Sequence, residues 1–179
     1  MSEIKSLAAP KVSFDRRAVV KGAAWSVPVI AAAIAAPAAA ASTPPSAKLS
    51  GVYAGSLSPN NKKLTAPSGL DILNTSGVPG SDNVTVTVTI TRTAGSPGVF
   101  IASLGGVPPT SGTGTAYADN VLTAMFTILV TRPTATQNFA LAYSRDGGAS
   151  SPGGSYAMNV SVSLPTATLT DSSALQLGK

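Results

Sequence analysis

Cysteine and histidine are absent from this chain of 179 residues, glutamate occurs only at Glu3, and tryptophan occurs only at Trp25. Without cysteine there can be no disulfide, although an exported protein would be free to form one. Without histidine or cysteine, the usual nucleophile–base pairs and zinc sites are excluded. The sequence therefore predicts a protein that is not an enzyme, with no catalytic residues, no metal and no cofactor.

Charged side chains are also scarce, at 11% of the residues. Five of the twelve basic residues precede Ala41, and residues 42–179 keep seven basic and five acidic residues, a net charge of +2. Within that part, Lys62 and Lys63 are the only adjacent basic pair. Binding to nucleic acid needs clustered lysine and arginine, so we expect no nucleic-acid partner.

The first quarter of the chain has the layout of an export signal. The basic residues Arg16, Arg17 and Lys21 precede an uncharged stretch over 22–36, which is followed by Pro37 and a run of alanines. A basic region, an apolar region and a small-residue Ala-x-Ala-like site, in that order, are typical of a signal peptide.

This segment resembles the twin-arginine (Tat) signal peptides, whose pattern is Ser/Thr-Arg-Arg-x-Phe-Leu-Lys. Arg16, Arg17 and Lys21 match the pattern, whereas Asp15 replaces the hydroxyl residue and valines replace Phe-Leu. The resemblance implies a helical signal over 1–41, recognised by the Tat translocase. It also implies a signal peptidase as the second partner in export, and a secreted or cell-envelope location. The residues of the predicted cleavage site are Ala39, Ala41 and Ser42.

Two other interpretations stay open for this segment. The arginine pair could belong to an ordinary signal for the general secretory route. Residues 22–41 could also remain as a membrane anchor, since about 20 apolar residues can span a bilayer. Pro28, Pro37 and the many alanines disfavour an anchor, so we expect no stable membrane span after cleavage.

Beyond a Pro/Ser/Thr spacer at 42–47, the sequence predicts strands. Val84–Thr91 alternates valine or isoleucine with threonine, which places the apolar residues on one face of a strand. Similar rows occur at 122–130, 139–143 and 156–164, and weaker strands are expected at 49–57, 70–74 and 99–104. Met125 and Leu129, on the reverse face of one row, suggest additional burial there.

Turns rich in glycine and proline separate these runs, as in Ser76–Gly80 and Ala94–Gly98. About seven short strands with frequent turns predict a single antiparallel β-sandwich over 48–166, with a polar tail over 167–179. The pattern resembles the immunoglobulin-like modules of bacterial surface and secreted proteins. That resemblance is architectural, because a cysteine pair and a core tryptophan are both missing.

Candidate binding residues are few, and each has a simpler structural interpretation. Two aspartates could act as an acid–base pair, and Asp82 with Asp146 could contribute to a calcium site, but each aspartate lies beside turn residues or in a polar segment. Exposed tyrosines could stack on sugars. Thr85–Thr91 could offer one row of an ice-binding surface, and Leu164–Thr168 is a faint sortase-like motif with the wrong fourth and fifth residues. The aspartates are Asp71, Asp82, Asp119, Asp146 and Asp171, and the tyrosines are Tyr53, Tyr117, Tyr143 and Tyr156.

By elimination, the sequence favours an exported, non-enzymatic structural or adhesive β-sandwich module that acts through its surface. The alternative is a module that binds carbohydrate or another small ligand. An exposed patch lined by tyrosine would favour this alternative, and a smooth threonine and serine surface with an unpaired edge strand would favour the structural or adhesive module.

Overall fold

The computed structural model describes residues 43–58, 61–95, 98–111, 114, 116–145 and 153–178. The signal motif (Arg16, Arg17, Lys21) and the cleavage site (Ala39, Ala41, Ser42) lie outside these residues. Within them the protein is all-β, and there is no helix long and apolar enough to cross a membrane. The prediction of an all-β domain is thus confirmed.

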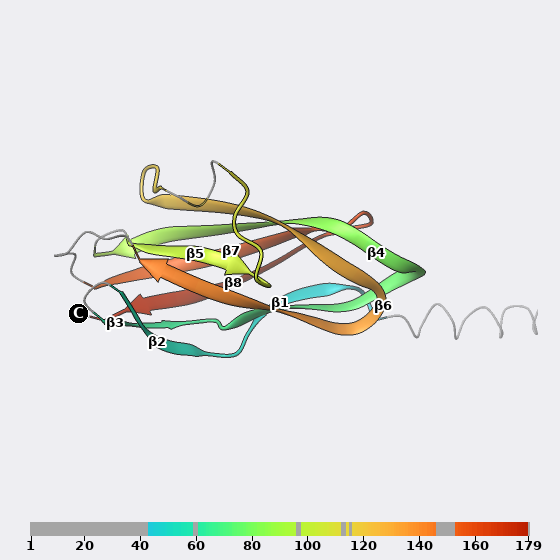
Figure 1. Cartoon of the computed structure of the whole chain (residues 1–179), viewed down its shortest axis with the longest axis horizontal. Coiled ribbons are helices and arrows are strands. Elements are labelled where there is room, and N and C mark those ends of the chain that lie inside the picture. Colours follow the sequence, from blue (N-terminus) through green and yellow to red (C-terminus); the bar gives the residue numbers. More distant parts are fainter. Residues whose placement is uncertain are drawn as a thin grey trace, which may run out of the picture. The chain divides into compact units, whose positions relative to one another are not determined.

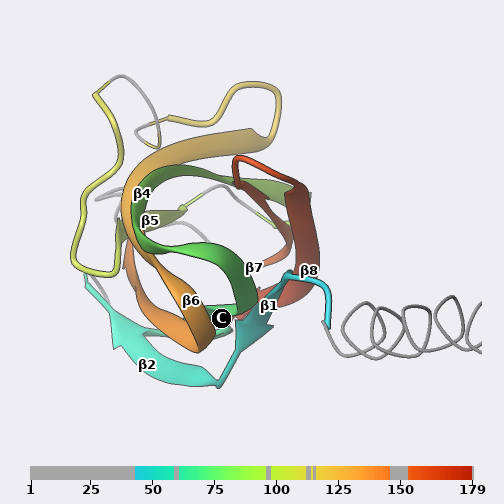
Figure 2. The same ribbon diagram turned by 90° about the vertical axis from the view of Figure 1, so that its right-hand side faces the viewer.

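Eight strands form one antiparallel sheet that curls around a single interior (Figures 1 and 2). The sheet order is β2-β3-β8-β7-β4-β6-β5, and β1 pairs with β4 beside this path. The strands are β1 (Ser46–Ser50), β2 (Tyr53–Leu57), β3 (Lys62–Ala66), β4 (Gly69–Ala94), β5 (Val99–Leu104), β6 (Val121–Arg145), β7 (Gly154–Ser163) and β8 (Thr168–Leu177).

The two longest strands, β4 with 26 residues and β6 with 25, pair with each other on both sides of a bend. Gly69–Thr75 of β4 pairs with 134–140 of β6, and Gly80–Thr91 pairs with 121–132. The register shifts between Thr75 and Gly80, and Figure 1 shows both strands turning back there, at the right of the view. Strand β1 pairs with β4 beside the first part of this pair, and β7 pairs with β4 beside the second; β5 pairs with 141–145 of β6, beyond the first part.

Polar contacts stabilise the bend. Thr75, which is 4% exposed, donates its hydroxyl to the Thr131 carbonyl and accepts from the Thr134 N–H, each at 3.2 Å. Nearby, Arg132 Nε lies 2.6 Å from Asp82 Oδ2, which forms an ion pair across β4 and β6. These contacts occupy the place where the regular ladder of backbone hydrogen bonds is interrupted.

The chain enters and leaves the sheet at opposite ends. Pro45, just before β1, borders the same small surface cavity as Thr75 and Ser76 at the bend. Gly178, just after β8, borders another cavity with Ala94 and Gly95, at the far end of β4. Figure 1 shows the same placement of the C-terminal end, away from the bend.

The core is built by the alternation that the sequence predicted. One face of β7, and of β4 and β6 outside the bend, is buried, and the opposite face of the aligned parts of β4 and β7 carries mainly threonine and serine. Tyr143 and Tyr156 point inward with 9% and 2% exposure, as expected. The buried residues of these rows include Val84, Val86, Val88, Ile90, Leu122, Ala124, Phe126, Ile128, Val130, Phe139, Leu141, Met158, Val160 and Val162.

Three expectations are corrected. The predicted polar tail over 167–179 contains strand β8, because Leu169, Leu175 and Leu177 are buried in the core. The prediction of extra burial at Met125 and Leu129 is wrong, since they are 38% and 56% exposed. Rows expected as separate strands are parts of β4 and β6, because Ser76–Gly80 forms an irregularity within β4 and does not end it.

Two separate sheets of the immunoglobulin type are not confirmed. Strands β4 and β6 run through both parts of one continuous sheet, so the sheet has no break at which it could divide into two. The sheet also begins at Ser46, two residues before the predicted start of the domain.

Candidate functional site

The outward residues of four neighbouring strands form a surface of hydroxyl groups, which we call the hydroxyl face. The register aligns them in ranks that run across β6, β4, β7 and β8. A single strand offered one row of threonines in the sequence, and the fold adds rows from three more strands, about 4.8 Å apart. The three central ranks are Thr127–Thr85–Ser163–Thr168, Met125–Thr87–Ser161–Thr170 and Thr123–Thr89–Asn159–Ser172.

A shallow hollow lies over β7 within this face, and we call it the β7 groove. Residues of β4, β7 and β8 line it, among them Thr87, Ser161 and Thr170. Its lining covers two ranks: Ser161 lies between Thr87 and Thr170, and Asn159 lies between Thr89 and Ser172. In the first of these ranks a small serine lies between two larger threonines, and this difference in side-chain size contributes to the hollow.

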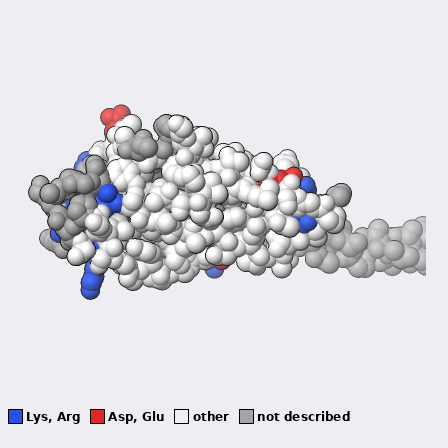
Figure 3. All heavy atoms as spheres, viewed as in Figure 1, with Lys and Arg blue, Asp and Glu red and all other residues white. Residues whose placement is uncertain are grey.

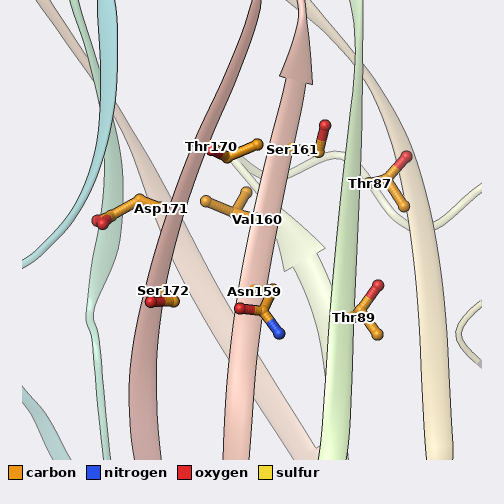
Figure 4. Close-up of a pocket in the computed structure, with 8 residues that line it drawn as sticks. All are labelled: Thr87, Thr89, Asn159, Val160, Ser161, Thr170, Asp171 and Ser172. Atoms are coloured by element: carbon orange, nitrogen blue, oxygen red, sulfur yellow. The ribbon is translucent and has the colours of Figure 1, made fainter.

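Figure 4 shows how the side chains at the groove are directed. Thr87, Ser161 and Thr170 leave their strands on one side of the sheet, and Val160 and Asp171 leave on the other. Val160 is buried in the core, and Asp171 binds the main chain of β1. The side chains offered to a ligand are therefore hydroxyls and the exposed amide of Asn159.

Charge is missing from the hydroxyl face. None of the residues in its three central ranks is acidic or basic, although domain surfaces usually mix charges of both signs. On the side of the molecule shown in Figure 3, the charged atoms likewise lie toward the ends and the rims. A ligand at the hydroxyl face would thus contact hydrogen-bonding groups and no charged side chain of these ranks.

The four tyrosines do not form an exposed stacking platform. Tyr143 donates its hydroxyl to the Pro67 carbonyl at 2.6 Å, and its ring lies 5.4 Å from that of Tyr53. Tyr117 donates to the Val99 carbonyl at 2.6 Å, with its ring edge-on to Phe100. All four are buried or half-buried, so sugar stacking on tyrosine finds no support in the described part of the chain.

Burial also changes the acidity of these tyrosines. It raises the pKa of Tyr143 well above the ordinary value, and the neighbouring Tyr53 adds to this. The pKa of Tyr117 is raised chiefly by burial and further by Tyr156, and burial likewise raises the pKa of Tyr156. The three phenols stay neutral at physiological pH and act as packing and hydrogen-bonding groups.

Each aspartate in the described residues has a structural role. Asp82 pairs with Arg132, Asp71 accepts from the Asn138 amide at 2.5 Å, and Asp171 accepts from the Leu49 N–H at 2.6 Å. Asp119 lies with Asn120 in a two-residue turn, where both have positive φ as type I′ turns require.

Asp146, the proposed calcium partner of Asp82, lies outside the described residues. Among those residues, no cluster of three or more acidic or histidine side chains could hold a metal. The sortase-like segment Leu164–Thr168 contains the turn between β7 and β8, closed by a hydrogen bond from the Leu164 N–H to the Ala167 carbonyl.

The outer edge of β6 is largely covered. Loop backbone N–H groups and the side chain of Gln137 bind the edge groups along this strand, which disfavours addition of a further strand. The N–H groups of Thr110 and Gly114 donate to the carbonyls of Met125 and Thr123, respectively. The Gln137 side chain accepts from the Thr131 N–H through Oε1 and donates to the Leu129 carbonyl through Nε2.

The sequence therefore pointed to one row of the hydroxyl face and missed Asn159, Ser161 and Thr170 as groove residues. A signal for them was present, since serine and threonine alternate with apolar residues in both segments. Their alignment with Thr87 depends on strand register, which only the fold supplies. Comparison with protein-family models, curated proteins and solved structures gave no match to the chain.

Proposed function

We propose that this protein is an exported, non-enzymatic structural or adhesive module of the cell surface or the secreted fraction. The observation that carries the proposal is the hydroxyl face, an ordered and uncharged surface that spans four strands. Such a surface can hold a partner through many weak hydrogen bonds and offers no group suited to acid–base chemistry.

Export is the second part of the proposal and is supported by the sequence of residues 1–41. The Tat-like arginine pair and the alanine-rich cleavage site imply that the Tat translocase and a signal peptidase handle the chain. Carbohydrate or small-ligand binding through tyrosine is less well supported, because Tyr53 and Tyr117 make internal contacts.

Cell fractionation with a surface variant tests the proposal. We expect the protein in the envelope or the medium, and we expect Ser161→Arg, which places charge on the hydroxyl face, to reduce its retention on the envelope. Thr136→Arg is the matched control, since Thr136 is exposed on β6 outside this face. A protein found only in the cytoplasm, or equal retention of both variants, would contradict the proposal.

A further inference from the structure

We infer that the outer edge of β2 pairs with the same edge of a second copy of this chain, in antiparallel orientation and with Gly55 at the two-fold axis. β2 ends the path of hydrogen-bonded strands and pairs on one side only, with β3. Figures 1 and 2 both show it at the margin of the sheet. This edge is a different surface from the hydroxyl face, so the inference does not depend on the proposed function.

The other strand edges in the described part of the chain are protected. At β5, the Tyr117 hydroxyl binds the Val99 carbonyl, and the loop after the strand folds back and bonds to Leu104. The outer edge of β6 is bound by loop N–H groups and by a glutamine side chain. β1 lies against β8, which contributes the carboxylate of Asp171. Each of these edges is therefore closed to a further strand.

β2 lacks such protection. Among the described residues, no loop or side chain bonds to the outer backbone groups of Tyr53–Leu57. These five residues include no charge and no proline, and their register with β3 has no bulge, although edge strands usually avoid pairing by such features. The outward side chains, Ala54 and Ser56, are small and exposed. Such a row of N–H and C=O groups selects another extended chain as its partner.

The sequence of β2 is complementary to itself in the antiparallel arrangement. Pairing around Gly55 places Tyr53 opposite Leu57 of the second copy on the inward side of the strand. On the outward side it places Ala54 opposite Ser56 of the second copy. Because the axis is two-fold, each pair forms twice, as in the symmetric interfaces of most homodimers. A second copy therefore fits this edge along its whole length.

The charges on β3 favour the antiparallel orientation. Within one chain, Thr65 lies beside Ala54, and Lys63 lies beside Ser56. Across the dimer, a rank would run from Thr65 and Ala54 of one copy to Ser56 and Lys63 of the other, so each rank holds a single lysine. A parallel pairing in register would instead place Lys63 of both copies in one rank, and like charges in one rank are unfavourable.

Sedimentation equilibrium of the full-length protein tests the inference. A strand of five residues gives a small interface, so the measurements should extend from about 1 μM to about 1 mM. We expect a reversible equilibrium between monomer and dimer.

Two double variants of β2 test the register. Ala54→Lys with Ser56→Lys would place lysine opposite lysine twice and should weaken the dimer. Ala54→Lys with Ser56→Asp would place lysine opposite aspartate twice and should strengthen it. The dissociation constants of these two variants should differ by about tenfold or more.

Controls locate the contact. Thr136→Lys with Ala140→Lys adds two charges at exposed positions of β6 and should leave the dissociation constant unchanged. Ser161→Arg, on the hydroxyl face, should leave it unchanged as well. Urea melts show whether each variant is folded. Hydrogen exchange of the unmodified protein needs no variant: the amides of β2 should become more protected as the protein concentration rises.

Three results would overturn the inference: a protein that stays monomeric up to about 1 mM, equal dissociation constants for the two double variants of β2, or association without added protection of the β2 amides. A dimer that Ser161→Arg dissociates would assign the contact to the hydroxyl face. The proposed function fails separately, through equal retention of Ser161→Arg and Thr136→Arg on the envelope.

Discussion

The carboxylate of Asp171 on β8 accepts a hydrogen bond from the backbone N–H of Leu49 on β1, at 2.6 Å. The two residues are 122 positions apart in the sequence. β1 pairs with β4 and β8 pairs with β7, so neither strand forms a ladder with the other. This side chain therefore links two strands of the sheet where backbone pairing does not.

Asp171→Ala should lower the free energy of unfolding by about 1–3 kcal/mol, because it leaves the partly buried N–H of Leu49 without its acceptor. Asp171→Asn keeps an oxygen in reach and should have a smaller effect. Urea melts of the two variants measure the difference. Equal losses would mean that the negative charge, and not the hydrogen bond, carries the stabilisation.

Thr75→Val should be destabilising at the bend of β4 and β6. The change keeps the volume but removes the hydroxyl that serves the Thr131 carbonyl and the Thr134 N–H, so about 1–3 kcal/mol should be lost. Thr87→Val is the matched control, because Thr87 lies on the outward side of the same strand. That change should alter stability by about 0.5 kcal/mol or less. Similar urea midpoints for the two variants would contradict the role given to Thr75.

Substitutions in β4 and β7 should separate by the face of the sheet. Val86 is fully buried, so Val86→Ala should cost about 1–3 kcal/mol through lost burial and a cavity. Thr87→Ala, one residue further, should cost about 0.5 kcal/mol. Val160→Ala and Ser161→Ala should repeat the contrast in β7. A melt without cooperativity, or equal effects at neighbouring positions, would argue against this packing.

Stability should fall at alkaline pH because of the tyrosines. The pKa values of Tyr117, Tyr143 and Tyr156 are raised in the folded protein, whereas an unfolded tyrosine ionises near pH 10, at about its ordinary value. Above that pH the unfolded chain releases protons that the folded chain keeps, so the free energy of unfolding decreases as pH rises.

Urea melts between about pH 9 and pH 11.5 measure this decrease, and tyrosinate absorbance reports ionisation. Tyr143→Phe removes one of the titrating groups and should make the decrease shallower, although it also loses the hydrogen bond to Pro67. If Tyr117, Tyr143 and Tyr156 ionised with a midpoint near pH 10 in a protein that remains folded, the expectation would be contradicted.

Export should depend on the arginine pair. Replacing Arg16 and Arg17 by lysine should abolish export, because the Tat route discriminates against lysine pairs, whereas a general secretory signal tolerates them. Immunodetection in medium and envelope fractions measures the effect.

Intact mass of the exported protein should place its first residue near Ser42. A mass of the full 179 residues would indicate a retained anchor.

The local period of the sequence predicted the strand faces well. Val84–Thr91 and 156–163 alternate cleanly, and the inward row of each is buried. β8 was missed because Asp171 and Ser173 interrupt its row of leucines, so the segment looks polar. The reason for Asp171 at that place is a contact with β1, which no local pattern reveals.

Long-range features could not be predicted in the same way. Gly77, Pro79 and Gly80 are typical of a turn between two strands, but they form a bulge within one strand because both flanks keep pairing with β6. The β7 groove depends on the register of three strands at once. A shift of one residue in any of them would bring apolar side chains to the outward face.

The positions of the start of β1 and the end of β8 determine how the domain would respond to a pulling force. β1 begins at the bend, and β8 ends at the opposite end of the sheet. Pulling the ends apart would slide β1 along β4 and β8 along β7. Hydrogen bonds in antiparallel pairs lie across the strands, so such a load falls on all of them together and does not open them one by one. A domain attached at one end and pulled at the other would be loaded in shear. In this geometry a sheet resists unfolding by force most strongly.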